Sequence, residues 1–227
     1  MMKIPFSIYD FFGYLSSGFA VLAAYDYASG GKWLFADSVP LGIGVLIVLA
    51  AYVTGHVVSH LASVVIEHGF LRRVLGSPEE HLLAASPSQT RWRWLFPGNF
   101  SPLPKETRDR VLAKATAAGA GSHPRALFFH CHAVVKSDDA TLSRLNTFLN
   151  LYGFCRNLAM AVLLASFVLM GSTIVRVEWP LSMDSKNSLL MGALCLPIAY
   201  VLVLRYLKFF RHYTLEVFVS YAEAGSR

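Results

Sequence analysis

The 227-residue sequence is poor in charge and in cysteine. Only 15% of its residues are Asp, Glu, Lys or Arg, while 55% are hydrophobic. A soluble domain usually carries about 25% charged residues, so this composition favours a chain that crosses a membrane several times. The three cysteines, Cys131, Cys155 and Cys195, are odd in number and have no framework spacing, which argues against structural disulfides and fits a reducing compartment or the membrane.

The usual catalytic motifs are also missing from the sequence. There is no glycine-rich phosphate loop, no Ser-His-Asp arrangement that can be ordered, and no carboxylate pair with a defined acid and base. The acidic pairs Glu79-Glu80 and Asp138-Asp139 are more simply helix starts, where negative side chains oppose the positive end of the helix dipole. These absences weaken the case for an enzyme, and we predict neither a catalytic residue nor a cofactor.

Four apolar segments are long enough to cross a bilayer, whose hydrocarbon core of about 30 Å needs about 20 helical residues. They cover roughly residues 6–28, 40–66, 151–175 and 188–207. The first segment could instead be a secretory signal, since it begins with Lys3, but Asp10 interrupts its apolar run. We therefore expect four transmembrane helices.

The distribution of Lys and Arg predicts the orientation of these helices. Residues 67–147 hold eleven of them, whereas the loop at 29–39 has only Lys32 and the loop at 176–187 has Arg176 and Lys186. Because positive residues stay on the cytosolic side, both termini and residues 67–147 are expected in the cytosol.

The region between the second and third spans has helix signals and no alternating strand pattern. Helix starts are indicated at Ser77-Pro78, where a capping box runs to Glu80, at Pro104-Lys105, and at His123-Pro124. The predicted fold class is an all-α membrane protein in which helices two to four extend into a cytosolic helical module. For the helix that follows span four, an alternative is that it lies in the membrane interface.

The predicted domain boundaries follow from these segments. Residues 1–66 form transmembrane helices 1 and 2, 67–147 the cytosolic module, 148–207 transmembrane helices 3 and 4, and 208–227 a cytosolic C-terminal helix.

Two charged residues lie about five residues inside apolar segments: Asp10 in the first and Arg156 in the third. An isolated charge in hydrocarbon costs several kcal/mol, so such charges pair, reach the interface or line a wet cavity. Since His60 lies at a similar depth, we expect an intramembrane polar layer of Asp10, His60, Arg156 and Asn157. The alternative is that Arg156 alone extends its side chain to the interface.

Two histidine patterns are candidate metal ligands. His56 and His60 are spaced i, i+4 and share a helix face, as two ligands of one metal would. A metal enzyme would need further ligands, for instance from the His130-Cys131-His132 run, whose members point to different sides of a helix. The sequence therefore predicts no metal site, and a metal-dependent membrane enzyme remains the alternative function.

The cytosolic module is basic, with eleven Lys and Arg against seven Asp and Glu in residues 67–147. Its run Arg91-Trp92-Arg93-Trp94 suits either a membrane interface or a polyanion on whose bases the indoles stack. As ligand-binding residues for an anionic signal we predict five arginines of the module: Arg91, Arg93, Arg108, Arg110 and Arg125.

Two motifs carry a resemblance to known proteins. The stretch from Ile8 to Leu15 with Gly18, and Leu151-Tyr152-Gly153-Phe154 with Arg156-Asn157-Leu158, resemble small bacterial membrane effectors of phage-defence operons. The matched positions are Asp10, Gly13, Gly18, Arg156 and Asn157, with Gly13 and Gly18 expected in helix packing. The length and four-span plan are similar to the channel-forming effectors of the Hailong type.

This resemblance implies a homo-oligomeric, tetrameric ion channel in antiviral defence. It also implies a nucleotidyltransferase partner protein and a nucleotide or oligonucleotide ligand that opens the channel. The sequence also predicts membrane lipid as a binding partner. A membrane scaffold that anchors a cytosolic partner is a third reading of the same sequence.

Overall fold

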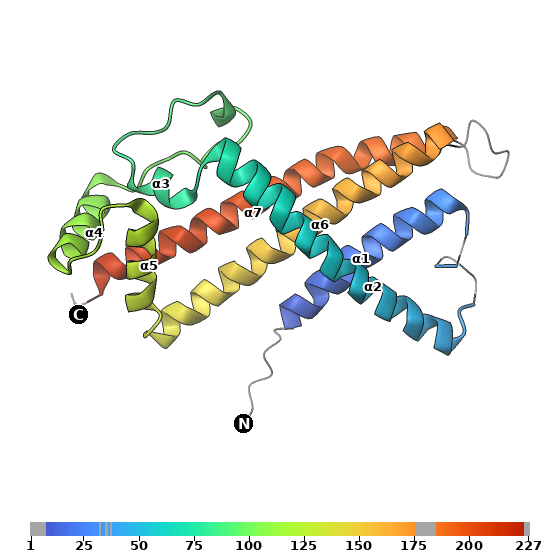
Figure 1. Cartoon of the computed structure of the whole chain (residues 1–227), viewed down its shortest axis with the longest axis horizontal. Helices are drawn as coiled ribbons and strands as arrows, with labels where there is room; N and C mark the ends of the chain where they lie inside the picture. The colour runs from blue at the N-terminus through green and yellow to red at the C-terminus, as the bar shows by residue number, and fades with distance from the viewer. Residues whose placement is uncertain (1–7, 32, 35, 37, 176–184, 225–227) are drawn as a thin grey trace. The chain divides into compact units, whose positions relative to one another are not determined.

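The computed structural model describes residues 8–31, 33, 34, 36, 38–175 and 185–224, with the backbone alone at 8–10, 174, 175 and 185. Among these residues there is no β-strand, so the all-α prediction is confirmed. The elements in chain order (Figure 1) are α1 (Ile8–Ser29), α2 (Leu41–Ala62), the π-helix η1 (Ser63–Leu75), α3 (Pro78–Leu83), the 3₁₀-helix η2 (Arg91–Arg93), α4 (Lys105–Ala117), α5 (Pro124–Val135), α6 (Asp139–Val175) and α7 (Ser185–Glu223). The loop residues Lys32 and Arg176 lie outside the described part of the chain.

Three of the described helices are long and apolar enough to cross a membrane. They begin at Leu41, Asp139 and Lys186, and so correspond to the second, third and fourth predicted spans. The first predicted span, α1, does not meet the same criterion of length and composition. Its hydropathy is lowered by four tyrosines and by the acidic residues Asp10 and Asp26.

The chain divides into two compact units. Unit 1 comprises residues 1–68 and 153–205, and unit 2 comprises residues 69–152 and 206–227. The sequence predicted boundaries after residues 66, 147 and 207. The structure divides two residues after the first, five residues after the second and two residues before the third.

In unit 1, α1 and α2 cross at a point where their backbones touch. A side-chain carbon added to Gly18 would overlap the carbonyl group of Ala51 and come within 2.9 Å of the Gly55 nitrogen. One added to Gly55 would overlap the carbonyl group of Tyr14. Small residues permit such close approach of membrane helices, so these glycines fix the α1–α2 crossing. Gly13 is less restricted, since its added carbon would lie 3.7 Å from the Phe154 ring.

The long helices α6 and α7 pack on each other in unit 1 through another small residue. The Ser166 hydroxyl donates a 2.7 Å hydrogen bond to the Gly192 carbonyl, and a side chain on Gly192 would meet Met170 at 2.6 Å. The end of α1 joins this packing, because Ala24 and Ala28 cluster with Ala165 and Leu169 of α6.

The winding of the second apolar helix changes after Ala62. Within α2 the buried residues are Ala51, Gly55, Val58 and Ala62, three or four positions apart, as an α-helix requires. In η1 the buried residues that follow Ala62 are Ile66, Leu71 and Leu75, four or five positions apart. The wider spacing matches the i→i+5 bonding of a π-helix, which also ends η1 through a 3.0 Å bond from the Gly76 N–H to the Leu71 carbonyl.

Unit 2 has a core of its own, built around the C-terminal turns of α7. Val217, Phe218 and Tyr221 are at most 2% exposed and cluster with residues of α3, α4, α5 and the start of α6. Lys114 of α4 closes the end of α7 by donating to the carbonyls of Tyr221, at 2.8 Å, and of Ala224. α7 itself runs as one helix from Ser185 to Glu223, with Pro197 inside it.

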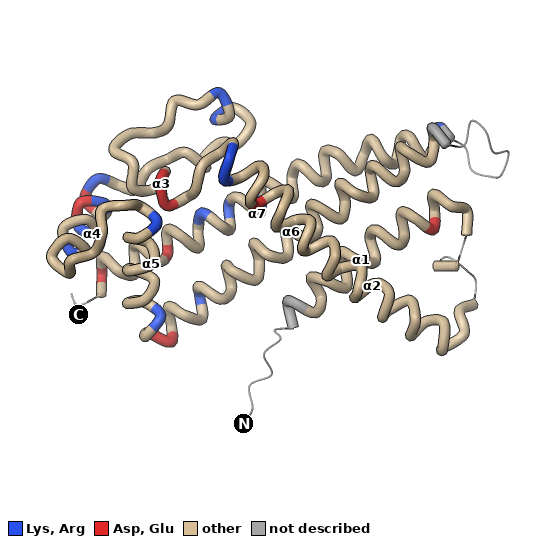
Figure 2. The backbone as a smooth tube through the Cα atoms, viewed as in Figure 1, with Lys and Arg blue, Asp and Glu red and all other residues tan. Residues whose placement is uncertain are grey.

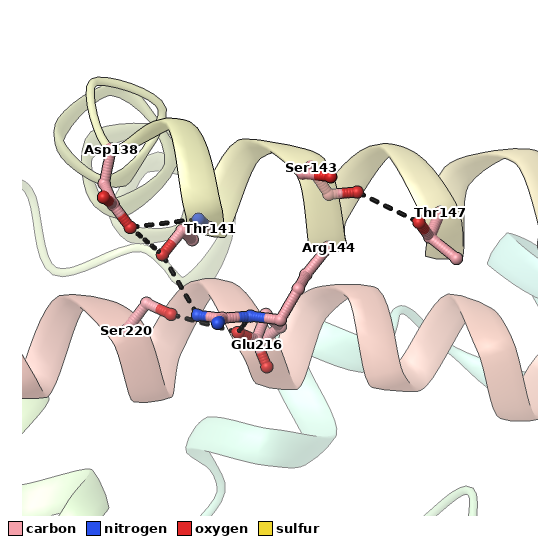
Figure 3. Close-up of polar contacts among 7 residues, drawn as sticks. All are labelled: Asp138, Thr141, Ser143, Arg144, Thr147, Glu216 and Ser220. Atoms are coloured by element: carbon pink, nitrogen blue, oxygen red, sulfur yellow. Dashed lines mark hydrogen bonds and ion pairs between the residues drawn. The ribbon is translucent and has the colours of Figure 1, made fainter.

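The helix starts of unit 2 follow the sequence signals closely. The Ser77 N–H donates to Glu80 at 3.3 Å at the start of α3, and the His123 side chain accepts from the Arg125 N–H at the start of α5. Asp138 lies just before α6 and caps its start, since its carboxylate accepts from the Thr141 N–H at 3.0 Å and from the Thr141 hydroxyl at 2.6 Å. Figure 3 shows this cap beside the ion pair that joins α6 to α7.

Candidate functional site: a buried ion pair in unit 1

An ion pair in unit 1 lies between two of the apolar helices. The Arg156 guanidinium of α6 donates from Nη1 to the Glu67 carboxylate of η1 at 2.6 Å. The side chains of Arg156 and Glu67 are only 15% and 16% exposed. Each charge thereby replaces part of the hydration that the other has lost.

Asn157 completes the environment of the guanidinium. Its carbonyl oxygen accepts from Nε and Nη2 of Arg156, both at 3.4 Å, and the residue itself is 6% exposed. Three nitrogens of the guanidinium thus donate to two acceptor atoms, one on Glu67 and one on Asn157. Removing one partner of such a pair leaves a buried charge uncompensated, which costs about 3–5 kcal/mol.

The structure places the predicted polar layer as follows. Arg156 and Asn157 come together, and Glu67, which the sequence pattern did not single out, is the carboxylate at Arg156. His60 lies on an exposed face of α2. Asp10 lies in α1, but its side chain is outside the described part of the chain.

His56, the other histidine of α2, takes part in an aromatic cluster with α1. Its ring stacks on Tyr14 with 4.1 Å between centroids and meets Tyr52 edge-on at 4.7 Å. Among the described residues, no three His, Cys, Asp or Glu side chains lie together as metal ligands would.

A second buried carboxylate in unit 1 was missed by the sequence reasoning. Asp26, near the end of α1, is fully buried and accepts the backbone N–H groups of Trp33 at 3.1 Å and Leu34 at 3.0 Å. It holds the loop that follows α1 against the helix end. The signal available in the sequence was an aspartate just before Ser29-Gly30-Gly31, where a chain reversal leaves backbone N–H groups without helical partners.

The apolar helices of unit 1 keep large exposed faces. On α2 the most exposed are Leu41, Leu46, Val53 and Val57, between 56% and 86%. On α7 they are Leu190, Leu194, Ile198 and Val201, between 53% and 60%. A single chain therefore leaves wide apolar surface for lipid or for other copies of itself.

The five predicted ligand-binding arginines all lie in unit 2 but differ in what they contact. Arg108 is engaged internally, since it donates to the Ala84 carbonyl at 3.0 Å and pairs with Asp109 at 3.1 Å. Arg91 and Arg125 lie over the rings of Trp92 and Phe129, at 5.5 and 5.8 Å. Arg91, Arg93, Arg110 and Arg125 are exposed and open to an anion.

The His130-Cys131-His132 run of α5 serves the core of unit 2. His130 hydrogen-bonds the Tyr221 hydroxyl at 3.2 Å, and His132 stacks on Phe128. Cys131 is fully buried, and this burial raises the pKa of its thiol to about 12. A thiol with so high a pKa is a poor nucleophile and a poor metal ligand at neutral pH.

Comparison with known proteins adds no assignment to this geometry: the chain matches no known protein family, no curated protein and no solved structure.

Proposed function

We propose that the protein is a channel-forming or pore-forming effector of the bacterial inner membrane, assembled as a homo-oligomer and acting in anti-phage defence. In this proposal α1 is the fourth membrane-spanning helix and both termini lie in the cytosol. The buried Glu67–Arg156 pair carries the proposal, because it places a charged, hydrogen-bonded group between helices whose other faces are apolar. Intramembrane charges of this kind commonly mark an ion pathway or an element that moves.

The exposed apolar faces of α2 and α7 support an assembly of several copies. Three or four helices from one chain are too few to enclose a wide aqueous path, so conduction requires a ring of identical subunits. A tetramer is the subunit number that the resemblance implies.

In this proposal unit 2 receives the opening signal. Its four exposed arginines suit a nucleotide-type anion, made by a nucleotidyltransferase partner. Such a ligand opens the channel only if it binds the open state more tightly than the closed one.

The test is electrical recording from the full chain in planar bilayers, before and after addition of short oligonucleotides of defined composition. We expect single-channel currents that one oligonucleotide increases, together with an oligomer in native mass spectra. Arg110→Ser with Arg125→Ser should reduce the response to the oligonucleotide, while Arg144→Ser, which removes a cation already paired with Glu216, should not.

Absence of current at every ligand and lipid composition, in protein that is folded and inserted, would count against the channel. Stoichiometric iron or zinc in the purified protein, with activity lost in His56→Ala, would favour the metal enzyme. If the protein is a scaffold, the purified protein should contain no stoichiometric metal and should conduct no current. A neighbouring nucleotidyltransferase gene would favour the defence role.

A further inference from the structure

Unit 2 exposes four arginines and one tryptophan on two segments that pack on each other. Trp94 is 84% exposed, a high value for tryptophan, which has the largest side chain of the amino acids. The exposed arginines are Arg72 and Arg73 at the end of η1 and Arg91 and Arg93 in η2. We call these five residues the Arg/Trp surface; Figure 2 shows positive residues on both segments.

Aromatic packing holds the two segments of this surface together. Phe70, two residues before Arg72, meets Trp92 with 6.4 Å between ring centroids and Phe96 with 5.5 Å. Trp92 lies between Arg91 and Arg93, so its contact with Phe70 brings the two arginine pairs onto neighbouring segments. The segment is fixed further by the Arg93 N–H, which donates to the Thr90 carbonyl at 3.1 Å. The neighbouring ring of Trp92 is packed inward, whereas Trp94 is left exposed on a structured turn.

The segment that carries Arg91, Arg93 and Trp94 has charge of one sign. From His81 to Lys105 the chain contains no Asp or Glu, so Arg91 and Arg93 have no acidic neighbour in sequence. Guanidinium groups bind phosphate through two parallel N–H donors, and an exposed indole ring prefers the headgroup level of a bilayer. Together the side chains suit a surface that is both anionic and partly apolar.

The position in the chain favours a lipid over a soluble polyanion as that surface. Arg72 and Arg73 follow Val64 and Val65, which are 50% and 45% exposed on the apolar helix that begins at Leu41, by seven to nine residues. Basic residues directly after a membrane span lie among anionic headgroups on the cytosolic side. A soluble polyanion would require no such connection to a span.

We propose that the Arg/Trp surface binds the headgroups of anionic phospholipids, with the Trp94 ring seated at the headgroup level. Binding there holds unit 2 at the bilayer. It also narrows the site for the soluble signal from the four exposed arginines named above to Arg110 and Arg125, because Arg91 and Arg93 are then engaged by lipid. This inference stands whether or not the protein conducts ions.

The test uses the full chain in nanodiscs whose lipids carry bromine on the acyl chain near the headgroup, where it quenches tryptophan fluorescence by contact. Trp94→Phe identifies the share of the signal that comes from Trp94. We expect that share to be quenched in discs containing phosphatidylglycerol, less so in pure phosphatidylcholine, and the difference to shrink at high salt.

Removing the cations tests the charge separately from the ring. Each basic residue near an anionic membrane contributes a factor of roughly five in binding. Arg91→Ser with Arg93→Ser should therefore raise several-fold the phosphatidylglycerol fraction needed for half-maximal quenching. Arg110→Ser with Arg125→Ser removes the same charge from α4 and α5 and should leave that fraction unchanged. Thermal unfolding of each variant shows that it is folded.

Three outcomes would overturn the proposal. Trp94 fluorescence could be quenched by iodide in the water and not by brominated lipid. Both double variants could shift the lipid dependence equally, which would indicate net charge alone. An oligonucleotide or inorganic phosphate could change Trp94 fluorescence in pure phosphatidylcholine discs while phosphatidylglycerol does not, which would assign the surface to a soluble anion.

Discussion

At the scale of single residues, Arg156 depends on the carboxylate of Glu67. We predict that Arg156→Met or Glu67→Gln lowers the free energy of unfolding by about 3–5 kcal/mol, because either leaves a buried charge without its counterion. The double change Glu67→Arg with Arg156→Glu should recover part of that loss. Thermal or denaturant unfolding in detergent micelles measures it, and equal stability of the single variants and the wild type would contradict the prediction.

The Arg144–Glu216 pair of unit 2 is the natural control for this measurement. Its bond is 2.7 Å long, almost the same as that of Glu67–Arg156, but the Arg144 side chain is 56% exposed (Figure 3). Exposed pairs contribute only about 0–1 kcal/mol. Arg144→Met should therefore cost far less than Arg156→Met, and the comparison isolates the effect of burial.

Asp138 makes the start of α6 sensitive to acid. Hydrogen bonds from the Thr141 hydroxyl and then from the Thr141 N–H lower the pKa of the Asp138 carboxyl below its ordinary value of 3.8. A carboxyl whose pKa is lower in the folded state stabilises the fold above about pH 4, and this contribution is lost as the pH falls through the folded-state pKa.

We predict that Asp138→Ala destabilises unit 2 at pH 7 and that the difference from wild type becomes smaller as the pH falls below about 4, because protonation removes the charge of Asp138. Asp138→Asn keeps an acceptor for the Thr141 N–H without a titrating charge, so its stability should depend less on pH. Unfolding curves recorded from pH 7 to pH 2 measure both effects. A gap between Asp138→Ala and wild type that stays constant with pH would exclude this origin.

The sequence could identify charged residues within apolar segments but not the residues that pair with them. Arg156 stands out because an arginine is costly in an apolar segment, and Asn157 is beside it in the chain. Glu67 does not stand out, since it follows the apolar part of its segment and resembles an ordinary polar residue past a span. Its contact with Arg156 joins residues 89 positions apart, and only the packing of η1 on α6 makes it.

At the scale of elements, the α1–α2 crossing depends on the absence of side chains at Gly18 and Gly55. We predict that Gly18→Ala separates the helices and costs about 1–3 kcal/mol, because its Cβ would overlap the Ala51 carbonyl, which is backbone and cannot move alone. Gly42→Ala and Gly44→Ala are matched controls, since nothing lies within 4 Å of an added carbon at either position.

These controls should be neutral or slightly stabilising, because alanine is a better helix former than glycine. Melting temperatures of the three variants give the comparison. If Gly18→Ala melted with the controls, the close contact of α1 and α2 would be excluded as a source of stability.

Local signals predicted the helices of unit 2 well, because proline, capping and glycine residues act within one turn. α3, α4 and α5 begin within two residues of the expected starts, and α4 ends before Gly119, whose φ of +71° suits a residue without a side chain. The π-helix η1 was not predictable in the same way. Extending the α2 period beyond Ala62 would place Gly69 and Arg73 inward, whereas the structure buries Leu71 and Leu75.

At the scale of the whole molecule, unit 2 depends on the last turns of the chain. Val217, Phe218 and Tyr221 are nearly fully buried in its core, and burying each such side chain contributes about 1.5–3 kcal/mol. That sum is comparable to the entire stability of a typical domain.

We therefore predict that removing residues 209–227 unfolds unit 2, whereas removing 225–227 leaves it folded. Hydrogen exchange monitored by mass spectrometry distinguishes the two, since the amides of α4 and α5 should exchange rapidly only in the longer truncation. Protected α4 and α5 amides in the longer truncation would show that unit 2 folds without the end of α7.

Composition indicates that lipid-compatible and water-compatible segments alternate along the chain. What composition could not predict is which segments build each core. The C-terminal stretch is basic and aromatic and could equally have lain on a membrane surface, and only its contacts with α4 and α5 distinguish the two arrangements.

The loose winding of η1 has a consequence for how the chain tolerates changes in length. An α-helix advances 100° per residue, so deleting one residue inside α2 would turn every later side chain to a different face. Because η1 carries more than 3.6 residues in each turn, it can lose one and tighten toward an ordinary helix while its neighbours keep their orientation. Ser63–Leu75 is thus the stretch of this apolar helix where a single-residue deletion disturbs the register least.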